Sequence, residues 1–533
     1  MAIQRKTQRP EYWQEHFTVE YEDLEHLYNL FIESGRPHSV DELALALVRR
    51  RCEKEEEIIR AELEKGQLFQ PKNSYGEGQK IVLPAFDYVL GTVVGVRPGY
   101  NPEYGEFKVI QVQIEGDDGK VREFASELKV PHKLNREETE GWDLAGELDS
   151  PEELYFKYGR SIRDQLERRL RQTEELGFVN FGTGWFLKDL IAEVHIGHLN
   201  IAEAMLEVSG RPLSSEEILK ELDLPPEVDR KVQVFSLNYS LRQDERFNEV
   251  GTDEKVLWFL RRLEPPEALN PPRHLLASVE PYDRSLLNEE LLRLEKELDD
   301  EATEAAIFAP SEMGLASSVT FVLTYPHYRS GTIPLTPRTR AFFPKGSTQH
   351  TMITFIDGRS GRHMPGWVVH QHKYACGLAQ WYRENDILVG AYITLERTED
   401  PMTVIINYTP RRQKREWVRI AKAKGTHLSF EMKTIPCGCE YDELMAVGVE
   451  DPASLDELRK ELEEKKVPLS SLLSQIFPEL AKLSPQGTVH AKTLYSAINV
   501  CRRYPPGPVF AALAENPSFK AVGDGYWLYD KSI

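Results

Sequence analysis

The chain has 533 residues, of which 41% are hydrophobic and 29% charged, with a formal net charge of −20 at pH 7. Such a length predicts several modules, because one domain usually takes about 100–200 residues. No apolar run reaches the roughly 18 residues of a membrane span, and no apolar run follows the basic N-terminus as in a secretory signal. Five cysteines do not make a disulfide framework. We therefore expect an intracellular, cytoplasmic protein that does not contact a membrane.

A helix-turn-helix pattern occurs twice in the first half of the chain. The sequence Ser-Gly-Arg-Pro stands at 34–37 and again at 209–212, each time after an amphipathic helical segment. The glycine ends the first helix and the proline prevents its continuation. A serine with a glutamate three residues later then predicts a capping box at the start of the next helix. The two pairs are Ser39/Glu42 and Ser214/Glu217.

A third, looser copy lies at the C-terminus. Segment 472–483 predicts a helix bent at Pro478, and a turn at 486–488 places Thr488 where it can cap the next helix. The second and third copies also share Phe-x-x-Val-Gly followed by an aromatic strand, at 247–260 and 519–528. This pattern predicts a hairpin that packs against the helices as a wing.

At these residues the sequence resembles the HARE-type winged helix-turn-helix, which occurs in the delta subunit of bacterial RNA polymerase. The match is best over Gly487–Tyr495 with Phe519 and the strand Gly525–Leu528. The resemblance implies DNA binding or attachment to transcription machinery, and it implies no chemical activity. In the second copy a helix over 228–243 would present the DNA contacts, which are Arg230, Lys231 and Arg242. In the third copy the helix over 508–515 has no polar side chain before its last residue, which favours a protein contact.

We expect an α+β, multidomain fold with three winged helix-turn-helix units, a small SH3-like β-barrel and a β-rich pseudobarrel. The short alternating strands after residue 79 predict the SH3-like barrel, whose acidic turns favour packing or protein binding. The expected modules are a winged-helix-like helical domain (15–75), the SH3-like barrel (76–135), a helical linker plus a HARE-type winged helix (150–264), an acidic helical linker (265–304), a basic pseudobarrel-like module (305–445) and a C-terminal HARE-type winged helix (450–533).

The positive charge is concentrated in one part of the chain. Residues 313–424 contain sixteen basic and seven acidic side chains, a net charge of +9, so the rest of the chain carries −29. The order of strands and turns over 317–408 looks like the DNA-binding pseudobarrel of plant auxin-response factors and of some restriction enzymes. That resemblance implies two loop arms that grip the major groove, here at Tyr328–Ser330 and Arg359–Arg362. The candidate contacts of this module are Arg329, Arg338, Arg340, Arg359 and Arg362.

Directly after these strands, segment 411–424 holds seven cations, one acid and a tryptophan. Such a segment can grip phosphates and stack on a base. If it were helical, Arg412, Arg415, Arg419 and Lys422 would lie on one side. The alternative is a solvated segment that neutralises the acidic modules. The candidate contacts are Arg411, Arg412, Lys414, Arg415, Trp417, Arg419 and Lys422.

Two enzymatic or metal-binding alternatives are weaker. His370, His372 and Cys376 with Cys437 and Cys439 could supply zinc ligands, but the groups lie some sixty residues apart and lack a Cys-x-x-Cys pair. We favour outward histidines and buried thiols.

The second alternative is a nuclease. Glu431-x-Lys433, on an expected strand 428–435, is similar to the Glu-x-Lys part of restriction-type nucleases, with Asp386 or Asp400 as the companion acid. Such a triplet often arises by chance, and no other catalytic motif is present. We expect no catalytic residue, no metal and no cofactor.

The sequence therefore predicts a non-enzymatic, nucleoid-associated protein that binds double-stranded DNA and regulates transcription. The alternative is an accessory factor that docks on RNA polymerase or another protein machine through its acidic surface. The sequence does not define an oligomeric state.

Overall fold

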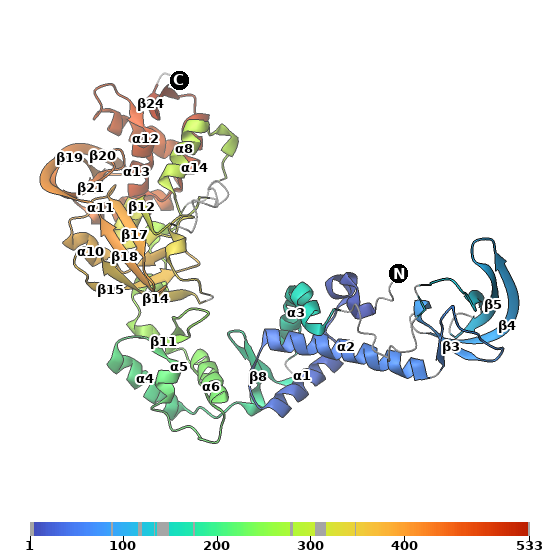
Figure 1. Ribbon diagram of the computed structural model, residues 1–533. Coiled ribbons are helices and arrows are strands. Elements are labelled where there is room, and N and C mark those ends of the chain that lie inside the picture. Colours follow the sequence, from blue (N-terminus) through green and yellow to red (C-terminus); the bar gives the residue numbers. More distant parts are fainter. Residues whose placement is uncertain are drawn as a thin grey trace. The chain divides into compact units, whose positions relative to one another are not determined.

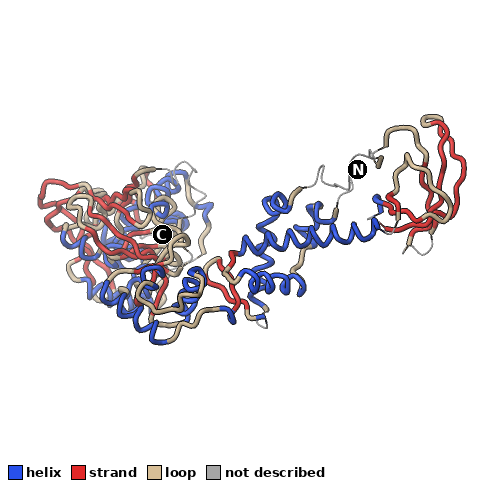
Figure 2. The backbone as a smooth tube through the Cα atoms, turned by 60° about the horizontal axis from the view of Figure 1, so that its bottom comes forward, coloured by secondary structure: helices blue, strands red, loops and turns tan. Residues whose placement is uncertain are grey.

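A computed structural model describes residues 5–64, 66–86, 89–115, 120–132, 134–135, 149–173, 176–277, 281–303, 316–346 and 348–530. The chain divides into two compact units, one formed by residues 1–195 and 223–240, the other by 196–222 and 241–533. Helices and several separate sheets occur in both (Figures 1 and 2), which confirms the α+β class. Within the described residues, no helix is both long enough and apolar enough to cross a bilayer.

The first unit contains a helical part and one larger sheet. Its elements are α1 (Tyr21–Ser34), β1 (His38–Ser39), α2 (Val40–Glu64), β2 (Gln67–Leu68), β3 (Lys80–Leu83), β4 (Val89–Asn101), β5 (Gly105–Ile114), β6 (Val121–Ser126), α3 (Pro151–Gln172), β7 (Phe178–Phe181), β8 (Gly184–Leu187) and most of α6 (Arg230–Gln243).

The second unit is longer and contains more strands. Its elements up to the basic module are α4 (Ile196–Ser209), β9 (Leu213–Ser214), α5 (Ser215–Leu219), β10 (Phe247–Glu249), β11 (Leu257–Leu260), α7 (Pro266–Leu269) and α8 (Glu289–Leu298). Those of the basic module are β12 (Ser318–Val322), α9 (Tyr325–Ser330), β13 (Thr332–Pro334), β14 (His350–Asp357), β15 (His363–Val369), β16 (Tyr374–Cys376), α10 (Ala379–Glu384), β17 (Tyr392–Arg397), β18 (Thr403–Tyr408), β19 (Pro410–Lys424) and β20 (His427–Cys439). The remaining ones are β21 (Val447–Val449), α11 (Pro452–Glu464), α12 (Leu469–Ala481), β22 (Val489–His490), α13 (Ala491–Cys501), α14 (Pro506–Glu515), β23 (Phe519–Gly523) and β24 (Tyr526–Tyr529).

Three small sheets have the same construction. In each, a two-residue strand directly before a helix pairs with the second strand of a hairpin, in the orders β1-β8-β7, β9-β11-β10 and β22-β24-β23. The central strand of each sheet carries a buried tryptophan opposite the first residue of the short strand. These antiparallel pairs are Trp185/His38, Trp258/Leu213 and Trp527/Val489. The internal repeat thus extends to all three copies, including the hairpin of the first copy, which was not expected from the sequence.

In the order of the chain, the larger sheet of the first unit is inserted between helices α2 and α3 of the first repeat. Its five strands follow the order β2-β3-β4-β5-β6, with a bulge between Val93 and Gly95. Phe69, Tyr75 and Ile110 belong to its core. Helix α3 and hairpin β7–β8 come after this sheet in the chain, and β8 pairs with β1. The first repeat therefore extends past the boundary expected at residue 150 and is completed only at residue 187. That the sheet closes as an SH3-like barrel stays a prediction.

A seven-stranded sheet forms the basic module, in the order β12-β17-β18-β14-β15-β16-β13. All of its pairs are antiparallel except β14 with β18. Strands occur throughout the range 317–408 in which the sequence predicted them, and helix α9 occupies the position of the first expected loop arm. The further likeness to a pseudobarrel is not tested by this topology.

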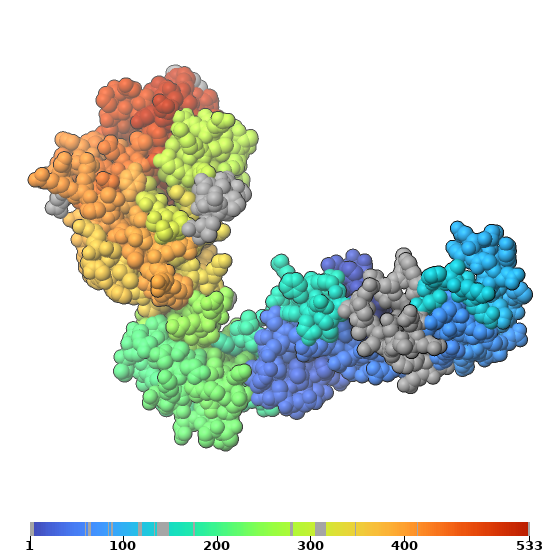
Figure 3. All heavy atoms as spheres, in the orientation of Figure 1, coloured from blue at the N-terminus to red at the C-terminus, as the bar shows by residue number. Residues whose placement is uncertain are grey.

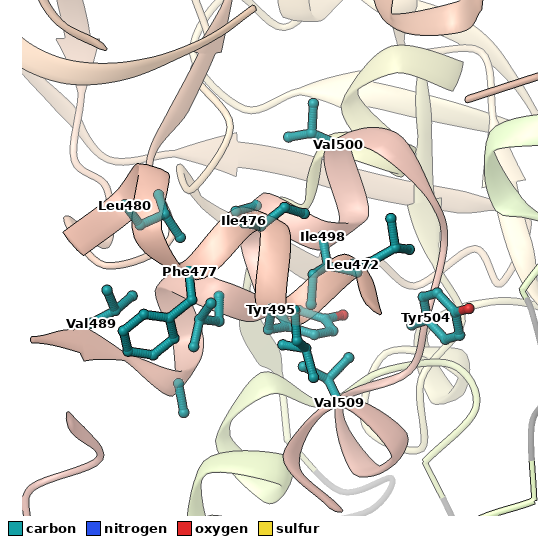
Figure 4. Packing of buried hydrophobic residues seen from close by; sticks show 14 of the residues in the cluster. Leu472, Ile476, Phe477, Leu480, Val489, Tyr495, Ile498, Val500, Tyr504 and Val509 are labelled. Carbon is teal, nitrogen blue, oxygen red and sulfur yellow. The ribbon is translucent and has the colours of Figure 1, made fainter. Parts of the chain in front are cut away.

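The C-terminal helices share one core with the β19–β20 hairpin. Phe477, Tyr495 and Val509 lie at the centre of this core (Figure 4), to which Ala421 and Phe430 of the hairpin also contribute. Helix α8 contributes Leu291, Leu294 and Leu298 to the same core. A single core therefore includes residues from either side of the boundaries expected at residues 304 and 450.

Acidic residues after α8 are buried as well. Arg503, 2% exposed, forms ion pairs with Asp300 at 2.5 Å and with Glu301 at 2.7 Å. The Tyr495 hydroxyl donates to the same Asp300 carboxylate at 2.9 Å. These charges are therefore paired inside the unit.

Most of the expected helix caps are present. The Ser214/Glu217 capping box is formed, and Ser39 and Glu42 make the same reciprocal hydrogen bonds. In the third copy the cap differs from the expectation. Helix α13 begins after His490, whose side chain, rather than that of Thr488, accepts the hydrogen bond from the Lys492 amide.

Candidate nucleic-acid interface

Segment 411–424 is a β-strand rather than a helix. Strand β19 pairs antiparallel with β20 from Lys414/Cys437 to Lys424/His427, and a bulge holds residues 411–413 before this ladder. The helical grouping of its cations is therefore wrong. Alternate residues face opposite sides of a strand, so Arg415, Trp417 and Arg419 share one side and Lys422 lies on the other. The hairpin forms a projection from its unit (Figure 3).

Five side chains at the start of this strand form what we call the cationic strip: Arg411, Arg412, Lys414, Arg415 and Trp417. All are exposed, and Trp417 is 66% exposed although it is large and aromatic. Nη2 of Arg415 donates to the Thr434 carbonyl at 3.2 Å. Within the described part of the chain, no side chain of the strip is in an ion pair. The strip thus offers unpaired positive charge on both sides of the strand, with Arg415 on the side of the exposed Trp417 ring and Lys414 on the other.

Two expected contacts farther along the strand are already occupied. Arg419 donates to the carbonyls of Glu443 and Leu444 (3.0 Å for the latter), and burial lowers the pKa of its guanidinium. Lys422 pairs with Glu431 at 2.5 Å and Glu450 at 3.7 Å, and its hydrogen bond to Glu431 raises the pKa of its ammonium. Neither side chain is available for phosphate without a rearrangement.

The other arginines of the basic module are mostly engaged with acids or rings. Arg329 lies in helix α9, not in a loop arm, and pairs with Asp456 at 2.7 Å. Arg338 pairs with buried Asp299 at 2.9 Å. The remaining three lie at exposed positions. They are Arg359, whose guanidinium is 5.0 Å from the Tyr408 ring; Arg362, paired with Glu384 at 2.5 Å; and Arg340.

Helix α6 exposes all three of its expected cations. Lys231 and Arg242 are exposed, and Arg230 donates to the Gln233 side chain at 3.1 Å. Gln233 and Asn238, which a reading helix would present outward, are buried, and Gln233 donates to the Pro225 carbonyl at 3.0 Å. Much of the polar surface expected to read bases on this helix is therefore used inside the protein.

Helix α3 carries a candidate surface that the sequence analysis missed. Exposed residues recur every three or four positions along one side of this helix. They are Phe156, Arg160, Asp164, Arg168 and Arg171. Phe156 is 91% exposed, and the Arg171 guanidinium lies 5.8 Å from the Trp185 ring of strand β8. The signal was present at 178–187, where Phe-x-x-Phe-Gly precedes Gly-Trp-Phe-Leu, as in the other two hairpins.

The proposed nuclease pair is part of an ion-pair cluster. Glu431 and Lys433 lie on strand β20 as expected, but Glu431 pairs with Lys422 and Lys433 pairs with Glu450. Among the described strands, β20 pairs only with β19, which carries no aspartate. The arrangement holds charges of both signs together, and the carboxylates of Glu431 and Glu450 are both bound by lysine ammonium groups.

The possible zinc ligands are not gathered either. His370 shares a hydrogen bond of 2.9 Å with Thr351, and burial lowers the pKa of its imidazole. Cys376, Cys437 and Cys439 are buried, with the Cys437 thiol donating to the Cys439 carbonyl at 3.3 Å. In the described ranges, no three His, Cys, Asp or Glu side chains are placed to hold a metal ion.

Compared with known proteins, the chain matches no protein-family model, no curated protein and no solved structure.

Proposed function

We propose that this protein is a non-enzymatic nucleic-acid-binding protein that grips duplex DNA with the cationic strip. The single observation behind this proposal is the group of exposed cations without ion-pair partners, beside exposed Trp417, in a chain of net charge −20. Elsewhere in the same module most arginines are matched by acids or rings. A local group of four exposed cations gives an acidic protein one place at which a polyanion can bind.

We further propose that the three small sheets with their helices are winged helix-turn-helix units. Support comes from their common strand order and from the tryptophan at the same register position in each. In the first unit of this kind, α3 occupies the place of the reading helix, and its exposed Arg160, Arg168 and Arg171 would then contact DNA. In the third, helix α14 is almost entirely buried, so it is not a candidate for the major groove.

A salt titration tests the proposal on the full chain. Fluorescence anisotropy with a labelled duplex of about 30 base pairs gives the dissociation constant from 50 to 300 mM salt. The affinity, log K, falls as log salt rises, and each lost phosphate contact makes this slope less steep by about 0.9. Replacing Arg411, Arg412, Lys414 and Arg415 by glutamine should therefore reduce the slope by up to about 3.6.

The matched control changes the net charge equally at a place not proposed to bind DNA. Four exposed lysines of α11, α12 and their connections serve, three of them in surface ion pairs with glutamates. They are Lys460, Lys465, Lys466 and Lys482. A control variant that loses as much affinity and slope as the strip variant would show only a general charge effect. If the strip variant keeps the affinity and the salt slope of the wild type, the strip does not bind DNA. A variant of the three α3 arginines, measured in the same way, then tests the other surface.

One observation favours a second candidate, an accessory factor that docks on RNA polymerase or another protein. The hairpin of the third sheet exposes Val522 (50%), Tyr526 (38%) and Leu528 (37%). Neighbouring apolar side chains on a surface are typical of a protein contact. Affinity purification of the tagged chain from native lysate, compared with a Val522→Ser/Leu528→Ser variant, tests this candidate. If both chains recover the same proteins, the hairpin is not the docking surface.

A further inference from the structure

A second possible binding feature lies near the hairpin but outside the cationic strip. It is a cleft of about 320 Å³ between α9, the segment after α10, and strands β20 and β21. Tyr328, Tyr382, Ile435 and Gly448 belong to its lining. Gly448 leaves no room for a side chain, because a Cβ there would lie 2.5 Å from Ile420 Cδ1. Strand β21 therefore packs closely on the hairpin at the border of the cleft.

The aromatic part of the lining is rigid. Tyr328 stacks on Tyr382, with ring centroids 5.9 Å apart and an interplanar angle of 23°. Tyr382 is 1% exposed, and its hydroxyl donates to the Thr332 carbonyl at 2.8 Å. Tyr328 is only partly buried. A fixed ring thus supports a second ring that borders the cleft.

The polar part contains both a donor and an acceptor. Arg383 and Asp386 line the cleft and are exposed, and within the described residues neither is in an ion pair. Nε of Arg383 donates to the Ala379 carbonyl at 3.3 Å, so the rest of its guanidinium remains for another partner. Burial raises the pKa of the Tyr328 hydroxyl; Asp386 raises it further and Arg383 lowers it, so both charges lie near that hydroxyl.

We propose that this cleft binds a purine or pyrimidine base, presented by a free nucleotide or by a nucleic-acid strand. The strand-borne case deepens the proposed DNA-binding function and rests on it, whereas the free-nucleotide case does not. A volume of about 320 Å³ is at the lower end of the range for small-ligand sites. A planar base can stack on tyrosine. Its edge carries donors and acceptors that match a carboxylate and a guanidinium.

Binding of mononucleotides to the full chain is the first test. Isothermal titration with each of the four deoxynucleoside 5′-monophosphates should saturate one site, and ribose 5-phosphate should not. Removing one base–aromatic stack, as in Tyr328→Ala, should weaken binding about 5- to 150-fold, whereas Tyr328→Phe should retain most of the affinity. No saturation by any nucleotide, or equal binding of ribose 5-phosphate, would overturn the proposal.

A surface substitution keeps the test independent of folding. Asp386 has a φ of 47°, a backbone conformation that asparagine tolerates well. Asp386→Asn should therefore fold normally. It should change the order of affinities among the four bases, because an amide, which both donates and accepts, replaces a carboxylate, which only accepts. The matched control is Asp524→Asn, at an exposed aspartate with a φ of 51° in another part of the fold. An unchanged order of affinities in Asp386→Asn would contradict the role given to the carboxylate.

A single-stranded oligonucleotide containing 2-aminopurine separates the two sources of the base. Fluorescence change in the wild type that is lost in Tyr328→Ala places a strand-borne base in the cleft. If only free nucleotides respond to that substitution, the ligand is a nucleotide. The variant lacking the four strip cations distinguishes the two proposals. If this variant still binds nucleotides but no longer binds the duplex, both sites are supported. If it still binds the duplex, the role of the strip is refuted, and the proposal for the cleft is unaffected.

Discussion

His490 makes the stability of the C-terminal helices depend on pH. It is 7% exposed, caps helix α13 through Nδ1, which accepts from the Lys492 amide at 3.0 Å, and contacts the Tyr526 ring edge-on at 4.9 Å. Only unprotonated Nδ1 can accept this hydrogen bond. Protonation of the imidazole therefore removes the cap.

The direction of the effect follows from the surroundings of the ring. Burial first, and the Lys492 ammonium second, lower the pKa of His490 below 6.5; Asp442 and Glu297 oppose this shift. The folded state then binds fewer protons than the unfolded state near pH 6. The contribution of His490 is complete above pH 6.5 and decreases as the pH falls below that value. By pH 5 the loss cannot exceed about 2 kcal/mol, and an N-cap contributes about 0.5–2 kcal/mol.

Hydrogen exchange followed by mass spectrometry measures this loss locally. Amides of residues 491–500, corrected for intrinsic rates, should lose protection between pH 7 and pH 5 in the wild type. His490→Asn retains a capping side chain but does not titrate in this range, so its protection should change less with pH. Other histidines of the chain titrate in both proteins and cancel in the comparison. Equal pH dependence in the two proteins would refute the assignment.

Three further substitutions test the packing. Arg503→Met leaves the buried Asp300 carboxylate without its cation and should destabilise the second unit by about 3–5 kcal/mol, seen as a lower midpoint in urea; Asp300→Asn in the same chain should restore part of the loss. Gly331→Ala should cost about 2–4 kcal/mol, because φ is 64° and the new Cβ would lie 2.5 Å from that of Ala379. A circular-dichroism melt unchanged from wild type would argue against that overlap. Ser214→Ala should cost about 1 kcal/mol through loss of the capping box, and exchange at the first turn of α5 that does not increase would contradict this.

Local signals in the sequence predicted the elements that depend on local chemistry. Glycine, proline and a serine–glutamate pair defined the turns and caps of the first two repeats, and alternating β-branched residues located most strands of the basic module. These features act over three to five residues, so they can be recognised without the fold. The same holds for the exposed Trp417 beside arginines.

The errors came from longer-range effects. Segment 411–424 has cations at helical spacing, yet pairing with β20 makes it a strand, and Arg419 then meets two backbone carbonyls that no local pattern indicates. Helix α8 was expected to belong to an acidic linker, but its leucines complete a core most of whose other members lie beyond residue 420. The hairpin β7–β8 was not assigned to the first repeat, because some ninety residues separate Glu64 at the end of α2 from Leu154 on α3.

That separation also constrains how the chain can fold as it leaves the ribosome. The short strand β1 has its partner in β8, nearly 150 residues later, whereas the five-stranded sheet between them consists of neighbours in sequence. Contacts between distant residues form more slowly than local ones. The inserted sheet can therefore reach its native pairing while the first repeat is still incomplete, with α2, which carries the buried Leu43 and Leu47, still without its contacts to α3. A ribosome that pauses before residue 151 would expose that apolar surface to chaperones.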